Sequence, residues 1–253
     1  MRVLITNDDG VAAPGLRHLA QALGEVGEVT VVAPEREQSA VGHGITLHKP
    51  LRVEALELDG LGPRAYAANG TPADCVVLGV VEFLGGQADL VMAGINTGAN
   101  LGEEVLYSGT VAAAMEGALA GIPSCAVSVT SREEPPYEAA ARFAARLARG
   151  LAELGLPRDC FLNINVPGGE IAGVELTRLG RRRYENRIFK RRDPRGKDYY
   201  WFTGDPIEED AEPGTDIGAI QAGRISVTPL FLNFSSPELP AGLEGLVREA
   251  LEG

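Results

Sequence analysis

The chain has 253 residues, of which 45% are hydrophobic and 23% are charged, and its formal net charge is −12. These values are ordinary for a soluble globular protein and leave room for a substantial core. No apolar run approaches the roughly 20 residues of a membrane-spanning helix, and the start of the chain lacks signal-peptide features, so a cytoplasmic location is expected. Apolar surroundings without CxxC spacing predict buried, reduced thiols at Cys75, Cys125 and Cys160.

Charge is distributed unevenly along the chain. Residues 178–197 carry ten Lys or Arg and two Asp or Glu, a net charge of +8, whereas the rest of the chain carries −20. Residues 205–216 follow with six acids and no base. A basic segment can bind RNA, but the acidic remainder would repel a polyanion. Nucleic acid is therefore not the expected partner; an arm that packs on a partner subunit, or simply solvated faces, would also account for the segment.

The first two thirds of the chain alternate apolar runs with helical patterns. Runs rich in Val and Ile without strict alternation are typical of parallel strands covered on both faces, and we expect such strands at 2–6, 28–33, 88–94, 123–129 and 161–166. Helical faces lie between them, formed by Leu16, Leu19, Leu23 and Val26, and by Phe143, Leu147, Leu151 and Leu154. Another helix should begin with Thr71 as N-cap and Pro72 at N1. This alternation predicts an α/β fold with an open, doubly wound, mainly parallel sheet.

The pattern changes after about residue 166. Residues 174–189 and 198–204 are expected to form a long hairpin with the basic segment near its tip, followed by a helix (215–223), a strand (224–230) and a closing helix (242–252). The hairpin would expose the aromatic side chains of Tyr184, Phe189, Tyr199, Tyr200 and Trp201. Such a surface is most economically covered by a second subunit.

Three polar clusters fall where expected strands end. They contribute Asn7, Asp8 and Asp9 in "NDDG", Ser39 and His43 in residues 33–46, and Asn96, Asn100, Ser108, Gly109 and Thr110 in residues 94–117. Ligands of open α/β sheets bind at the carboxyl ends of strands, so these clusters are candidates for one site. Taken alone, "NDDG" is equally consistent with a polar turn after a strand.

The residue types of these clusters favour a hard cation. Adjacent carboxylates such as Asp8 and Asp9 repel each other unless a cation or a proton lies between them. With Asn and Ser oxygens they form a set suited to Mg²⁺, Mn²⁺ or Ca²⁺. The histidines His18, His43 and His48 show no H-x-x-x-H spacing, which argues against a zinc hydrolase. The "SGT" of residues 108–110 suits the phosphate-binding start of a helix, although an ordinary N-cap needs the same residues.

Seven stretches resemble the SurE family of stationary-phase survival proteins: "ITNDDG", "APEREQSAVGHGIT", "NGTPADCV", "GINTGANLG", "SGTVAAAMEG", "LNINVP" and "GTDIGAIQAGRISVTPL". The family's loop often begins Ser-Gly-Ile-Asn, whereas this chain has Ala93 at the first position. The resemblance implies a metal-dependent phosphatase that hydrolyses nucleoside monophosphates, a 5′-nucleotidase with possible action on 3′-nucleotides. It also implies a three-layer Rossmann-like core (1–170) and a C-terminal hairpin arm (171–253), exchanged between subunits of a homodimer or homotetramer.

The resemblance also implies roles for particular residues. One divalent cation per subunit, Mg²⁺ or Mn²⁺, would be held by Asp8, Asp9, Ser39 and Asn96. The phosphate would contact Asn100, Ser108, Gly109 and Thr110, and His43 is a further candidate for substrate binding. Either a water activated by the cation attacks phosphorus, with Asp8 or Asp9 orienting it, or Asp8 attacks and forms an aspartyl-phosphate. A metal- and nucleotide-binding sensor without turnover, an exopolyphosphatase and an RNA-binding protein are the alternatives.

Overall fold

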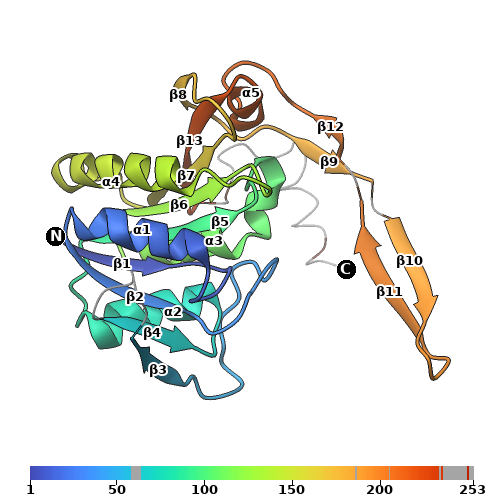
Figure 1. Cartoon of the computed structure of the whole chain (residues 1–253), viewed down its shortest axis with the longest axis horizontal. Helices are drawn as coiled ribbons and strands as arrows, with labels where there is room; N and C mark the ends of the chain where they lie inside the picture. The colour runs from blue at the N-terminus through green and yellow to red at the C-terminus, as the bar shows by residue number, and fades with distance from the viewer. Residues whose placement is uncertain (58–63, 186, 205, 234, 236–249, 251–253) are drawn as a thin grey trace.

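The computed structural model describes residues 1–57, 64–185, 187–204, 206–233, 235 and 250, and in them helices cover both faces of one large sheet (Figure 1). The strand order is β3-β4-β2-β1-β5-β6-β7-β13-β8, and six of the eight strand pairs are parallel. The strands are β1 (Arg2–Thr6), β2 (Glu28–Pro34), β3 (Val53–Leu56), β4 (Ala65–Ala68), β5 (Leu90–Thr97), β6 (Ser124–Val129), β7 (Cys160–Val166), β8 (Gly173–Leu176) and β13 (Arg224–Phe231). The predicted Rossmann-like, mainly parallel α/β fold is confirmed.

Each face of the sheet has its own apolar core. The helices are α1 (Pro14–Gly24), α2 (Pro72–Leu78), α3 (Gly109–Leu119), α4 (Tyr137–Leu154) and α5 (Asp216–Gln221), with single turns η1 (Gly79–Phe83) and η2 (Gly102–Leu106). Val3 and Ile5 of β1 pack on the side of α1 and α4, whereas Leu4 packs on the side of α2 and α3. This alternation of side chains along β1 produces the three layers.

The start of α2 follows the sequence prediction. The Thr71 hydroxyl accepts the backbone N–H of Asp74 at 3.1 Å, and the Asp74 carboxylate accepts the backbone N–H of Thr71 at 2.8 Å. This reciprocal capping box satisfies two backbone donors that the first helical turn would leave unpaired. Pro72 occupies the first position of the helix, as predicted.

The centre of the sheet contains a topological switch point. β1 pairs with β2 on one side and with β5 on the other, and all three strands are parallel. The chain segments that follow β1, β2 and β5 therefore leave the sheet at the same edge. Open α/β sheets bind ligands at such a point.

The hairpin arm differs from its prediction. Residues 174–176 belong to β8, which extends the main sheet by pairing with β13. The arm itself begins later, with β9 (Arg182–Tyr184) paired to β12 (Pro206–Glu209), and continues as β10 (Arg187–Arg192) paired to β11 (Asp198–Thr203). It projects from the body of the molecule (Figure 1). The expected single long hairpin is therefore wrong at its base, since β13 offers an open edge that residues 174–176 occupy.

Other sequence predictions have mixed outcomes. α5 and β13 lie where a helix and a strand were expected, whereas the predicted helix at 242–252 lies outside the described residues, apart from Ala250. The short pair β3 and β4 was not predicted.

All three cysteines are buried, and burial raises the pKa of the Cys125 thiol to about 12, as expected for inert thiols. Among the described residues, no helix has the length and apolar character to span a membrane.

Candidate active site

The segments that follow β1, β2 and β5 form most of the wall of an open cavity of about 860 Å³ at the switch point of the sheet. Its walls are formed by Asp8, Asp9, Glu37, Ser39, Ala40, Asn96, Thr97, Gly98, Ala99, Asn100, Glu103, Glu104, Tyr107, Ser108, Arg132 and Arg182. Six of the residues singled out in the sequence thus share one cavity: Asp8, Asp9, Ser39, Asn96, Asn100 and Ser108. Gly109, Thr110 and His43 are not part of its walls.

Asp8 follows β1 and is held by the first turn of α3. The backbone N–H of Thr110 donates to Oδ2 at 3.0 Å, and the Thr110 hydroxyl donates to Oδ1. The side chain is only 5% exposed. Burial raises the pKa of Asp8, the hydrogen bonds from Thr110 lower it, the nearby charge of Asp9 raises it, and the net direction is upward. Without a cation, this carboxyl group therefore ionises less readily than an exposed aspartate does.

Asp9 is held instead by the end of β5. Its Oδ2 accepts the backbone N–H of Thr97 at 3.0 Å and the Thr97 hydroxyl at 3.2 Å. That hydroxyl also lies 2.6 Å from the hydroxyl of Tyr137 at the start of α4. Among the described residues, Oδ1 of Asp9 has no hydrogen-bond partner, so this oxygen is available to a ligand in the cavity.

Asn96 reaches the cavity because β5 is irregular. The register with β6 shifts between Gly94 and Asn96, and Gly94 has a φ of +134°. A Cβ at Gly94 would lie 2.3 Å from the carbonyl oxygen of Val127, so only glycine fits there. The Nδ2 of Asn96 donates to the carbonyl of Gly98 at 2.8 Å, which fixes the amide orientation. Its Oδ1 has no partner within the described part of the chain.

The loop after β2 carries Ser39 and His43 to different places. The backbone N–H of Gln38 donates to the carbonyl of Asp8 at 2.7 Å, which anchors the loop beside the acid pair. Ser39 is exposed at the cavity wall, and its hydroxyl donates to Glu37 at 2.5 Å. His43 lies farther along, with Nε2 at 2.7 Å from a carboxylate oxygen of Glu116 on α3. The role of His43 in substrate binding stays a prediction.

The three residues of "SGT" occupy distinct positions at the start of α3. The Ser108 hydroxyl oxygen accepts the backbone N–H of Val111 at 3.1 Å and caps the helix. A Cβ at Gly109 would lie 2.9 Å from Cβ of Asp8 and 3.0 Å from its Oδ2, so the glycine permits this close approach. Thr110 uses both its donors on Asp8. Only Ser108 faces the cavity directly.

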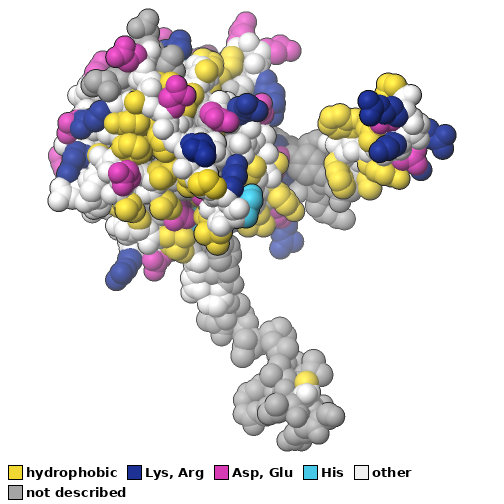
Figure 2. All heavy atoms as spheres, turned by 90° about the horizontal axis from the view of Figure 1, so that it is seen from below, with side chains coloured by type: hydrophobic (Ala, Val, Ile, Leu, Met, Phe, Trp, Pro, Cys, Tyr) yellow, Lys and Arg dark blue, Asp and Glu magenta, His cyan; other side chains and the backbone are white. Residues whose placement is uncertain are grey.

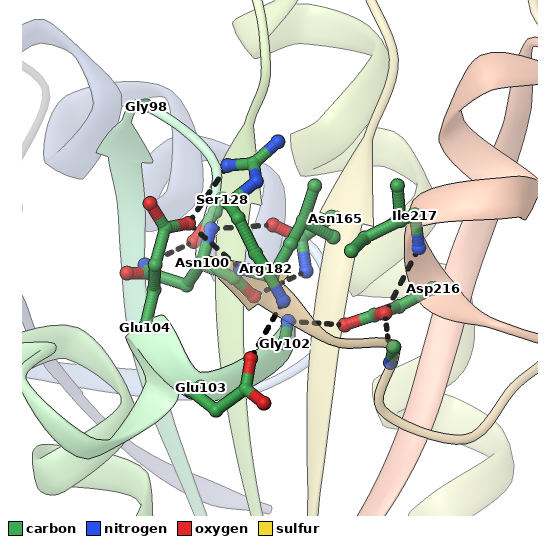
Figure 3. Close-up of polar contacts among 12 residues, drawn as sticks. Gly98, Asn100, Gly102, Glu103, Glu104, Ser128, Asn165, Arg182, Asp216 and Ile217 are labelled. Atoms are coloured by element: carbon green, nitrogen blue, oxygen red, sulfur yellow. Dashed lines mark hydrogen bonds and ion pairs between the residues drawn. The ribbon is translucent and has the colours of Figure 1, made fainter. Parts of the chain in front are cut away.

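Asn100 is fixed by buried polar side chains of β6 and β7 (Figure 3). Its Nδ2 donates to the Ser128 hydroxyl at 2.8 Å, and its backbone N–H donates to Oδ1 of Asn165 at 2.8 Å. The carbonyl of Asn100 accepts from Nδ2 of Asn163 at 2.8 Å and of Asn165 at 3.0 Å. Sequence reasoning did not assign these two asparagines a role, although polar amides inside a buried strand are a signal of such a task.

Arg182 of the arm also lines the cavity, and Figure 3 shows it beside Glu103 and Glu104. Its backbone N–H donates to Glu103 at 2.7 Å, and its guanidinium forms an ion pair of 3.0 Å with Glu104. Sequence reasoning missed all three residues, as well as Arg132 and Tyr107. No local pattern links Arg182 to residues almost 80 positions earlier.

The donor set of the cavity fits a hard divalent cation. Five acids and two arginines line it, giving a formal charge of −3 that would repel an anionic ligand. In the part of the chain that the structure describes, no group of three or more His, Cys, Asp and Glu side chains could hold a metal. A cation here would thus be bound by the two carboxylates together with amide and hydroxyl oxygens, which suits Mg²⁺ or Mn²⁺ better than zinc.

Fold and cavity together define a Rossmann-like α/β protein with an acidic, oxygen-rich ligand site beside a helix N-terminus. The chain belongs to the SurE family, since the family model described as survival protein SurE matches residues 3–186.

Known proteins support this assignment over nearly the whole chain. A protein of Moorella thermoacetica named 5′-nucleotidase SurE is 52% identical over 239 residues, which cover 93% of this chain and 92% of that protein. The 5′-nucleotidase SurE 1 of Thermus thermophilus is 49% identical and covers 98% of each chain. The crystal structure of SurE from Aquifex aeolicus matches all of both chains with a TM-score of 0.83 and 41% identity.

Proposed function

We propose that this protein hydrolyses nucleoside monophosphates to nucleoside and phosphate, acting as a 5′-nucleotidase. Its relatives from Moorella thermoacetica and Thermus thermophilus carry that name and match almost the full length of this chain. The observation that carries the proposal is the acid pair Asp8 and Asp9, which shares one cavity with Ser108 at the start of α3. Paired acids can hold the divalent cation of a metal-dependent phosphatase, and a helix N-terminus can bind the phosphate group of its substrate.

The proposed cofactor is one divalent cation per subunit, Mg²⁺ or Mn²⁺. It would be held by Asp8, Asp9, Asn96 and Ser39, of which Asp9 and Asn96 each offer a side-chain oxygen without a protein partner in the described residues. When bound, such a cation supplies positive charge to the phosphoryl group and makes water more acidic. The raised pKa of Asp8 fits a site that requires this charge.

The residues proposed to bind phosphate do so in different ways. The Ser108 hydroxyl oxygen already accepts from Val111, so its hydrogen is available to a phosphate oxygen. The Nδ2 of Asn100 uses one hydrogen on Ser128 and has a second for the ligand. The backbone N–H of Gly109 lies in the first turn of α3, where such groups bind anions. Thr110 acts through Asp8, which occupies both of its donors.

The attacking group is proposed to be water oriented by Asp9. Oδ1 of Asp9 opens onto the cavity, so through its contact with the cation Asp9 would set where the attacking water lies relative to the phosphate. Both oxygens of Asp8 are engaged by Thr110, which makes Asp8 the poorer nucleophile. Quenching the enzyme during turnover of labelled substrate separates the two routes. A hydroxylamine-sensitive label on the protein would indicate an aspartyl-phosphate instead.

The activity is tested with AMP, its 3′ isomer and p-nitrophenyl phosphate, each with Mn²⁺, with Mg²⁺ or with EDTA. We expect release of phosphate only in the presence of a divalent cation. Binding of AMP with no release of phosphate would indicate that the protein is a nucleotide-binding sensor and not an enzyme. Short polyphosphate in the same assay measures whether phosphate anhydrides are also substrates.

The arm is proposed to join subunits into a homodimer or homotetramer. Phe189 lies opposite Trp201, and Ile188 lies opposite Phe202, across the β10–β11 pair. These four side chains are 52–83% exposed, and hydrophobic and basic side chains gather together on the arm (Figure 2). An apolar surface of this kind on a projecting element is typical of an interface. Replacing Phe189 and Trp201 with serine should lower the mass measured by light scattering.

A further inference from the structure

Asp216 is a buried carboxylate that the proposed reaction does not use. It is the first residue of α5, and its exposed fraction is 0%. Its Oδ2 accepts the backbone N–H of Gly102 at 2.9 Å, and its Oδ1 accepts those of Gly180 at 2.7 Å and Ile217 at 2.9 Å (Figure 3). Burying a charge is costly unless hydrogen bonds compensate for it, and charge-assisted bonds are the strongest kind. Asp216 thus links the backbone at Gly102 and at Gly180 to the start of α5 through three charge-assisted hydrogen bonds.

The segments that Asp216 joins are the active-site loop and the base of the arm. Gly102 follows Asn100 by two residues and begins the turn η2, after which the chain reaches Ser108. Gly102 has a φ of +53°, and a Cβ there would lie 2.9 Å from the carbonyl oxygen of Gly180. The two backbones touch directly, with no space for a side chain between them. Asp216 holds this contact from one side.

The same two segments are joined a second time at the wall of the cavity. Arg182, two residues beyond Gly180, binds Glu103 through its backbone N–H and Glu104 through its guanidinium. On the inner side, Asn165 of β7 donates to and accepts from the backbone of Asn100. The loop between Asn100 and Ser108 is therefore held between β7 on one side and the arm base on the other.

We propose that Asp216 is a positioning residue for phosphate binding. By fixing Gly102, it sets the location of Asn100 relative to Ser108, so that both can contact the same phosphoryl group. This inference rests on the proposed function. Because a displacement of about 1 Å at a reacting centre can cost about 100-fold in rate, a change at Asp216 should reach the chemistry without touching the substrate.

The test is Asp216→Asn in the full-length protein. Asparagine keeps the size of the side chain but places an NH2 group against backbone N–H donors, so at least one of the three bonds is lost. We expect kcat/KM for AMP to fall about 10- to 100-fold and the affinity of the Mn²⁺-loaded protein for inorganic phosphate to fall similarly. The affinity for Mn²⁺ alone should change less than about threefold, because Asp8, Asp9 and Asn96 make no contact with Asp216.

Two further variants complete the test. One perturbs the same contact without changing Asp216, and the other is a control for a general loss of stability. Gly102→Ala places a methyl group against Gly180 and should give the same selective loss of phosphate affinity while Asp216 remains. Thr177→Val removes the buried hydrogen bond of 2.7 Å between Thr177, just after β8, and Thr228 of β13, without touching the loop. That control should lower the melting temperature and leave the affinities for phosphate and Mn²⁺ unchanged.

Wild-type phosphate affinity in Asp216→Asn or in Gly102→Ala would overturn the inference. So would an equal loss of phosphate and Mn²⁺ affinity, since that result indicates general disruption of the fold. Failure of the proposed function is a separate result. In that case the wild-type protein releases no phosphate from any monoester, but its phosphate and Mn²⁺ affinities still report on the role of Asp216.

Discussion

Thr110 and Asp8 are joined twice, since the backbone N–H of Thr110 donates to one carboxylate oxygen and its hydroxyl donates to the other. The pair connects the end of β1 to the first turn of α3 across 102 residues of sequence. It fixes the plane of the Asp8 carboxylate before any ligand arrives. Thr110 thereby supports the proposed cation site, although it is absent from the cavity wall.

Removing the Thr110 hydroxyl should weaken cation binding. Thr110→Val keeps the shape of the side chain but leaves Oδ1 of Asp8 without its donor. Loss of a supporting hydrogen bond to a metal ligand typically costs about 10- to 100-fold in affinity or activity. Thr110→Ser retains the hydroxyl and should stay close to the wild type. Isothermal titration calorimetry with Mn²⁺ compares the two variants. Equal Mn²⁺ affinity in both would show that the Thr110 hydroxyl does not support the cation site.

Asp9→Asn should separate activity from stability. The substitution removes one proposed cation ligand, and we expect at least about 100-fold lower activity towards AMP. Without metal, the melting temperature should hold or rise, because a like charge next to the buried Asp8 disappears. Asp89 is exposed and directly precedes β5, at the end of that strand away from Asp9, so Asp89→Asn serves as the matched control. Full activity in Asp9→Asn would show that the cation site is assigned wrongly.

The stability of the metal-free protein should depend on pH through Asp8. Because the pKa of Asp8 is raised on folding, the folded state binds this proton more tightly than the unfolded chain. Its stabilising contribution is present below the ordinary pKa of aspartate and is lost as the pH rises through the raised value. Asp8→Asn carries no charge and should be more stable than the wild type at pH 7.5, with a smaller advantage at pH 4.5. Urea unfolding in EDTA measures both differences. A constant difference would contradict the prediction.

Two glycine substitutions should affect different properties, one the binding of Mn²⁺ and the other the stability of the fold. Gly109→Ala would bring a methyl group to within 3.0 Å of the Asp8 carboxylate, so we expect weaker Mn²⁺ binding. Gly150→Ala, inside α4, meets no atom within 4 Å and should raise the free energy of unfolding by about 0.5–1 kcal/mol. Thermal melts and Mn²⁺ titration of both variants provide the comparison. If Gly109→Ala bound Mn²⁺ as tightly as Gly150→Ala does, the close packing on Asp8 would have no functional meaning.

Local sequence patterns predict the centre of this fold well. The strands β1, β2, β5, β6 and β7 are buried, apolar and β-branched, so composition alone marks them. The start of α2 is equally clear, because Thr71 and Pro72 act within one turn. By contrast, β3 and β4 have only four residues each and lack a repeating apolar pattern. Their structure depends on the pairing of β4 with β2, which no local signal reveals.

The candidate site was predictable only in part, for the same reason. Asp8, Asp9 and Asn96 follow strong strand signals, so their shared edge could be inferred. Arg182 and Asp216 reach the loop through contacts that span 78 and 114 residues of sequence. The arm base that brings Arg182 to the loop lies in the segment whose pairing was predicted wrongly. Neither residue could be assigned without the three-dimensional structure.

The central claim is that Asp8 and Asp9 hold a divalent cation facing the phosphate site. Anomalous scattering from crystals soaked in Mn²⁺ tests it most directly. We predict one peak per chain, about 2–2.5 Å from carboxylate oxygens of both acids and from the Asn96 amide oxygen. A cavity without a peak in Mn²⁺-saturated crystals, or one in which a basic side chain of the protein pairs with both acids, would contradict the account.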